Sequence, residues 1–156
     1  MKSLKKQSAF TLLEVMVALV IFSIGLLGLA GLQSAGIRNN QVSYSRTIAQ
    51  QLAYDMTDRM RNNPGVDYSG IAGAANDCVN ANCTSANMAA FDVFEWNTAI
   101  TGPDSPLKGA TGFIVNNGNG FTISIGWDEN GVGGGPATGC NPAAPAGFMC
   151  VSVDMR

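Results

Sequence analysis

Glu14 is the residue whose type and position most clearly suggest chemistry. It is the one charged residue between Phe10 and Leu32, a run of 23 residues. A carboxylate at the centre of a membrane-spanning helix costs about 2.5–3.5 kcal/mol and usually has a partner. The nearest cation, Lys6, precedes Glu14 and is separated from it by apolar residues. We therefore expect either a partner that another molecule supplies or a position for Glu14 at the lipid headgroup interface.

The four cysteines are the other reactive side chains: Cys78, Cys83, Cys140 and Cys150. The sequence contains no His and no C-x-x-C pair, so disulfides are favoured over a zinc site. Four cysteines allow three pairings, among which spacing favours two local loops without excluding the others. The segment from Asp128 to Gly131 has too few oxygen ligands for a twelve-residue calcium loop and is interpreted as a turn. We expect no metal and no cofactor.

Composition argues against several classes of function. The absence of His removes Ser-His-Asp and Cys-His catalysis, and no convergent pair of carboxylates can be placed, so we predict that the protein is not an enzyme. A net charge of −2 leaves no broad basic surface, which argues against a nucleic-acid partner. A length of 156 residues suits one domain of ordinary size.

The apolar run predicts a membrane-spanning helix. As a helix, residues 10–32 are roughly 35 Å long, enough to cross a hydrocarbon core. Three lysines precede the run within residues 1–9, and positive charge favours the cytoplasmic side. We expect a single pass through an inner membrane, with a cytoplasmic N-terminus and the rest of the chain translocated.

The helix is predicted to continue beyond the membrane to about Arg61. Apolar residues recur at helical spacing along one stripe, and Asp55 with Arg59 has the spacing of an i,i+4 ion pair. Asn62-Asn63-Pro64-Gly65 is a strong stop signal. The predicted segments are a basic leader (1–9), an apolar transmembrane half-helix (10–36), an amphipathic half-helix (37–62) and a globular head (63–156). The stripe on the second half comprises Ile48, Ala49, Leu52, Ala53, Met56 and Met60.

The head is predicted to hold a short helix and about three strands. Asn87 is a candidate N-cap for a helix over residues 88–100 that buries Met88, Phe91 and Trp96. Residues 113–115 and 121–127 predict a β-hairpin, and residues 148–155 predict a last strand. The strands alternate apolar and polar residues, so one face needs a cover, which the helical stripe can supply. The fold class is therefore α+β, with a long helix packed by its second half on a small antiparallel sheet, and Trp96 and Trp127 are expected core anchors.

The run from Ser8 to Val15 resembles the class III signal of type IV pilins and pseudopilins. A short basic leader and a small residue precede Phe-Thr-Leu-Leu-Glu and a long apolar helix. The resemblance implies that prepilin peptidase cuts after Ala9 and methylates the new N-terminal amine of Phe10. It also implies that Glu14 pairs with the N-terminal amine of a neighbouring subunit. The family usually has Gly before the cut, so Ala9 departs from its pattern.

A second resemblance concerns residues 23–33, which are similar to the corresponding stretch of the PilV minor pilins, the type IV pilus modification proteins. It implies a minor pilin in a tip or priming complex that supports pilus assembly, adhesion and twitching motility. The implied partners are prepilin peptidase, other minor and major pilins, and the inner-membrane assembly platform. The implied route runs from the inner membrane through the periplasm to the pilus. Alternatives are a minor pseudopilin of a type II secretion system and a binding module released by signal peptidase.

Overall fold

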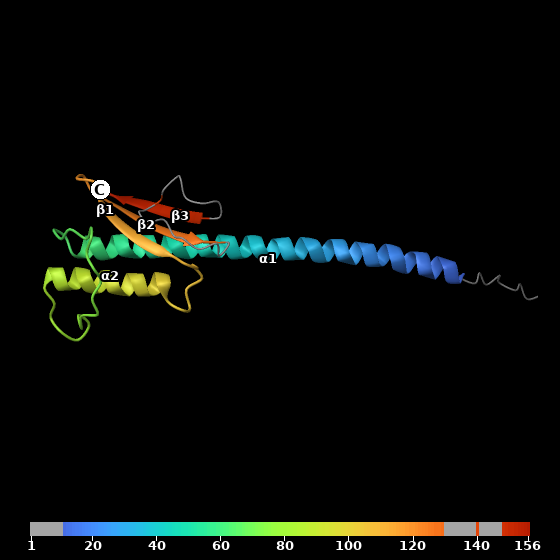
Figure 1. The fold of residues 1–156 in the computed structure, drawn as a ribbon, viewed down its shortest axis with the longest axis horizontal. Coiled ribbons are helices and arrows are strands. Elements are labelled where there is room, and N and C mark those ends of the chain that lie inside the picture. The colour runs from blue at the N-terminus through green and yellow to red at the C-terminus, as the bar shows by residue number, and fades with distance from the viewer. Residues whose placement is uncertain (1–10, 130–139, 141–147) are drawn as a thin grey trace, which may run out of the picture. The chain divides into compact units, whose positions relative to one another are not determined.

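The computed structural model describes residues 11–129, 140 and 148–156. Its elements are a long helix, a short helix and three strands (Figure 1). The chain divides into two compact units, Met1–Gln41 and Val42–Arg156. The predicted α+β class is confirmed. The bounds are α1 (Leu12–Asn62), α2 (Ser85–Thr101), β1 (Thr111–Asn116), β2 (Phe121–Asp128) and β3 (Phe148–Met155).

Helix α1 is close to its predicted range. It begins at Leu12, and the expected start, Phe10, lies outside the described residues. The helix ends at Asn62, as the predicted stop signal requires, because Pro64 lacks a backbone N–H and Gly65 adopts a φ of +86°. In the first unit, the apolar side chains of α1 are exposed, as Leu12 is at 79%. By length and composition, α1 is the one described helix that is apolar enough to cross a membrane.

The core of the second unit joins α1, α2 and the sheet. The predicted stripe of α1 faces this core, with Ala49, Ala53, Met56 and Met60 buried and with Ile48 and Leu52 half-buried against it. Trp96 and Trp127 are 2% and 1% exposed, so both predicted core anchors are confirmed. Since each contributes a large apolar surface, they account for much of the hydrophobic stabilisation of this small core.

Helix α2 begins earlier than the sequence predicted. Its N-cap is Thr84, whose side-chain oxygen accepts a hydrogen bond from the backbone N–H of Asn87, so the prediction of Asn87 as the cap was wrong. The buried face also differs: Met88 and Phe91 are only half-buried. The residues that α2 buries are Ala89, Asp92, Val93, Trp96 and Ile100. These five residues lie on one face of the helix at helical spacing, and Met88 and Phe91 lie beside that face.

The three strands form one antiparallel sheet in the order β1-β2-β3. Ile123 of β2 is paired with Ile114 of β1 and with Val153 of β3, which sets the register of the inward face. Gly112 brings β1 close to α2, since a Cβ there would lie 2.9 Å from Cδ1 of Ile100 and overlap the ring of Trp96. Both helices of this unit therefore contribute to the core beneath the sheet.

Candidate functional site

The first turn of α1 presents the carboxylate of Glu14. Thr11 precedes the helix, and its side-chain oxygen accepts a 3.4 Å hydrogen bond from the backbone N–H of Glu14. The Thr-x-x-Glu spacing is that of a capping box, in which the Glu side chain would also bond to the backbone N–H of the Thr. No such return bond, and no ion pair of Glu14, occurs within residues 11–129, 140 and 148–156. The carboxylate is therefore left exposed at the positive end of the helix dipole.

An apolar hollow adjoins this carboxylate along one face of α1. It is lined by Glu14, Val15, Ala18, Leu19 and Phe22, which lie on successive turns. The small side chain of Ala18 leaves the space that the larger neighbours border. This surface combines one anion with an exposed apolar stripe, so it is suited to an apolar helix that carries a cation. The two predicted processing residues, Ala9 and Phe10, lie outside the described residues.

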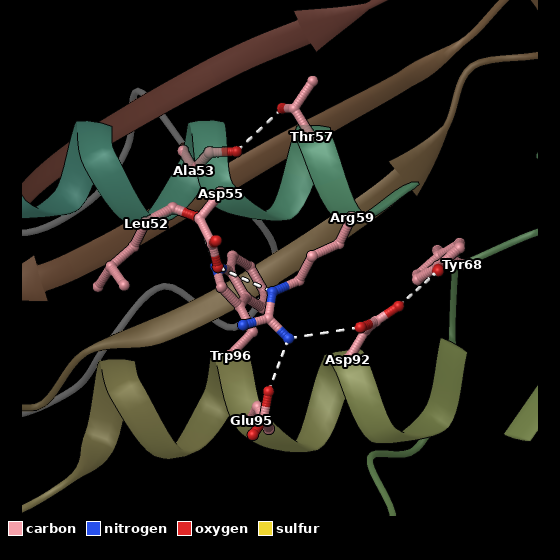
Figure 2. A network of polar contacts seen from close by, with 9 residues as sticks. All are labelled: Leu52, Ala53, Asp55, Thr57, Arg59, Tyr68, Asp92, Glu95 and Trp96. Atoms are coloured by element: carbon pink, nitrogen blue, oxygen red, sulfur yellow. Dashed lines mark hydrogen bonds and ion pairs between the residues drawn. The ribbon is translucent and has the colours of Figure 1, made fainter. Parts of the chain in front are cut away.

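A polar cluster in the second unit centres on Arg59 of α1 (Figure 2). Its guanidinium contacts three carboxylates: Nε lies 2.9 Å from Asp55, and Nη1 lies 3.4 Å from Asp92 and 2.8 Å from Glu95. The predicted pair of Asp55 and Arg59 is confirmed. The contacts to α2 were not predicted, because sequence spacing reports only neighbours within one helix. Arg59 thus joins the two helices at the surface of the core.

Buried Asp92 connects this cluster to Tyr68. The Tyr68 hydroxyl donates a 2.8 Å hydrogen bond to Asp92 and accepts one of 3.0 Å from Asn63. Burial raises the pKa of Tyr68 to about 12, and the bond to Asp92 adds to this rise while the bond from Asn63 opposes it. For Arg59, burial lowers the pKa, but hydrogen bonds to Glu95 and Asp55 outweigh that effect and raise it. The cluster therefore holds Arg59 charged and Tyr68 neutral.

The cysteines form the two local disulfides, Cys78–Cys83 and Cys140–Cys150. The first closes a short loop before α2. The second joins Cys140 to strand β3. Both disulfides lie in the part of the chain that the predicted topology places outside the cytoplasm, where oxidation is permitted.

Comparison with known proteins adds evidence for the N-terminal segment. Residues 4–30 match the family model described as the prokaryotic N-terminal methylation motif. The motif indicates a type IV pilin or pseudopilin precursor. The match includes Ala9, Phe10 and Glu14 and implies processing by prepilin peptidase and assembly with other pilins. A search of curated proteins and a search of solved structures found no significant match to this chain.

The head residues were the part of the site that sequence reasoning missed. Asp92 and Glu95 meet Arg59, and Tyr68 bonds to Asp92, only because the loop of more than twenty residues between the helices returns α2 alongside α1. A polar residue on the inward face of a predicted helix is a usable signal, and Asp92 is such a residue between Ala89 and Trp96. By contrast, Glu14 could be identified from the sequence because its significance depends on its apolar neighbours along the same helix.

Proposed function

We propose that the chain is a minor pilin of a type IV pilus that acts in a tip or priming complex. The observation that carries this proposal is an exposed apolar helix inside a matched N-terminal methylation motif, with a carboxylate, Glu14, that has no ion-pair partner among the described residues. Such a surface is stable in a membrane or in a bundle of similar helices. Its role is assembly, without turnover of a substrate.

The first step is processing at the membrane. Prepilin peptidase cuts the bond between Ala9 and Phe10 and methylates the amine of Phe10. The leader contains three of the nine basic residues, so its removal changes the formal net charge from −2 to −5. The mature chain then stays in the inner membrane through its apolar half-helix, with the head in the periplasm.

The second step is entry into the filament. The amine of Phe10 in one subunit is the partner proposed for Glu14 of its neighbour. A buried carboxylate is tolerable when it is paired, and a pair of this kind fixes the register between helices. The apolar hollow beside Glu14 favours an apolar helix as the occupant. The disulfides and the Arg59 cluster then hold the head together on the exposed part of the pilus.

The finer assignment to the PilV group of minor pilins rests on the resemblance of residues 23–33. It supports a role with other minor pilins, major pilins and the assembly platform, and with it adhesion and twitching motility. A minor pseudopilin of a type II secretion system shares the same N-terminal motif and is the second candidate. Deleting the gene distinguishes them, because loss of surface pili supports the first and loss of protein secretion with normal pili supports the second.

Mass spectrometry of the N-terminal peptide from the native cell tests the shared part of the proposal. We expect a chain that begins at Phe10 and carries one methyl group. A chain that begins at Met1 would contradict processing and leave a simple membrane anchor. A chain that begins near Gly31 would support a signal-peptidase product, the secreted binding module, and would overturn the pilin proposal.

A further inference from the structure

The turn between β1 and β2 contains two Asn-Gly pairs. They are Asn117-Gly118 and Asn119-Gly120, and both Asn side chains are exposed. In an Asn-Gly pair, the backbone nitrogen of the glycine can attack the side-chain amide of the asparagine, because glycine has no Cβ to obstruct the approach. The two reacting groups are therefore the asparagine side-chain amide and the glycine backbone N–H. Both pairs consist of Asn followed by Gly, but their hydrogen bonds in the folded structure differ.

The first pair is held by hydrogen bonds at both reacting groups. Nδ2 of Asn117 donates to Oγ1 of Thr122 at 2.6 Å, and the backbone N–H of Gly118 donates to Oδ1 of Asn116 at 2.8 Å. The Thr122 hydroxyl in turn donates to Asp154 of β3, so the acceptor is itself fixed. Reaction at Asn117 therefore requires that both bonds be broken first.

The second pair lacks these restraints. Within the described part of the chain, no hydrogen bond involves the side chain of Asn119 or the backbone N–H of Gly120. The carbonyl of Gly120 accepts a 2.8 Å bond from the N–H of Asn117, which holds the turn closed without occupying either reacting group. The backbone of Gly120 also passes so close to Met155 that a Cβ would overlap the Met155 carbonyl oxygen, so glycine is required there.

We propose that Asn119 is a site of spontaneous deamidation and that Asn117 is protected from the same reaction. The backbone nitrogen of Gly120 attacks Cγ of Asn119, a C–N bond forms, and the side-chain amine leaves as ammonia with the proton lost by the peptide nitrogen. Water then opens the cyclic imide at one of its two carbonyls. The product is aspartate or isoaspartate, and no oxidant or reductant takes part.

The reaction changes the charge of a defined surface. Asn119 and Asp154 both line a shallow hollow at this end of the sheet, together with Asn117, Phe121, Thr122 and Arg156. Deamidation places a second carboxylate in this hollow. The isoaspartate product also lengthens the backbone beside the close approach of Gly120 to Met155 and so loosens the end of the hairpin.

Peptide mapping by mass spectrometry tests the proposal on the full chain kept folded in detergent and aged in buffer. The expected result is conversion at Asn119 at least about tenfold faster than at Asn117, because two hydrogen bonds must break at Asn117. Conversion is read from the mass change of replacing an amino group with a hydroxyl. Equal rates at the two residues, or faster conversion at Asn117, would overturn the proposal.

Two controls separate the folded geometry from the local sequence. In urea, both pairs are released, and their rates should become similar; a difference that persists in urea would overturn the structural explanation. The variant Asn116→Ala removes the acceptor of the Gly118 N–H and should raise conversion at Asn117 without changing conversion at Asn119. No change at Asn117 in a folded variant would also count against the proposal.

Discussion

The indole N–H of Trp96 donates a 2.8 Å hydrogen bond to the backbone carbonyl of Leu52 and so joins α2 to α1 within the core. The same ring lies against Gly112 of β1. One side chain therefore contacts the two helices and the sheet. The bond also satisfies a polar atom that would otherwise be buried without a partner.

The variant Trp96→Phe should test this bond. Phenylalanine keeps much of the apolar surface but cannot donate, so we expect a loss of about 1 kcal/mol in the free energy of unfolding, plus the effect of a smaller ring. Trp96→Ala should cost about 3–5 kcal/mol because it also leaves a cavity. Chemical denaturation of the full chain in detergent, followed by far-UV circular dichroism, measures both. Similar losses in the two variants would contradict the expectation that ring packing contributes more to stability than the hydrogen bond.

Arg59 should stabilise the contact between α1 and α2. Arg59→Met keeps the aliphatic stem but leaves the buried carboxylate of Asp92 without its cation, and we expect a loss of about 2 kcal/mol in the free energy of unfolding. The side chain of Arg59 is 29% exposed, so solvent screening limits this effect. The double variant Arg59→Met with Asp92→Asn should recover part of the loss. A double variant as unstable as the sum of its single variants would show that the two residues do not interact.

Tyr68 should make stability depend on pH in the alkaline range. Its pKa is raised to about 12 in the folded state, above the ordinary value of 10.0. Deprotonation therefore favours the unfolded chain, so the contribution is complete below pH 10 and is lost as the pH rises through 12. Across this window, we expect the free energy of unfolding of the wild type to fall by about 2 kcal/mol more than that of Tyr68→Phe. Identical slopes for the wild type and Tyr68→Phe would contradict the prediction.

Gly112 should be intolerant of even one added methyl group. In Gly112→Ala the new Cβ overlaps the Trp96 ring, which two helices and the sheet hold in place, so we expect destabilisation of about 1–3 kcal/mol. Gly36→Ala is the matched control, because among the described residues no atom beyond the adjacent helix backbone lies within 4 Å of the added methyl group, and alanine favours a helix. Thermal unfolding of both variants measures the difference. Equal transition temperatures would refute the close packing at Gly112.

Glu14 should be needed for assembly and not for membrane insertion. Under the proposed function, Glu14→Ala leaves the amine of the neighbouring subunit without its partner, and we expect at least about tenfold less of the variant in sheared pili. Its amount in the inner membrane should be unchanged, because removing a charge makes the helix more apolar. Glu14→Gln is the control of similar size. Immunoblots of sheared pili and of membranes measure both, and normal incorporation would refute the pairing.

The elements that sequence reasoning predicted well depend on local pattern. Strand β3 was predicted with its observed bounds, because apolar residues alternate along it. The start of α2 was missed because Thr84 and Asn87 are both acceptable N-caps, and only the hydrogen bond from Asn87 to Thr84 selects between them. Likewise, Met88 and Phe91 were predicted to be buried because they are large and apolar. Both are only half-buried, because the packing of α2 against α1 and β1 buries other residues of α2.

The sequence by itself determined the apolar helix, the position of Glu14 within it, the end of that helix shortly before Pro64 and the α+β class. Each of these depends on residue types within a few turns or one strand, where spacing fixes which residues are neighbours. Only the tertiary structure decided that Arg59 meets Asp92 and Glu95, that Trp96 bonds to Leu52, and that one of two Asn-Gly pairs is restrained. Those contacts join segments far apart in the chain, and their geometry follows from packing a shared core, which local spacing does not encode.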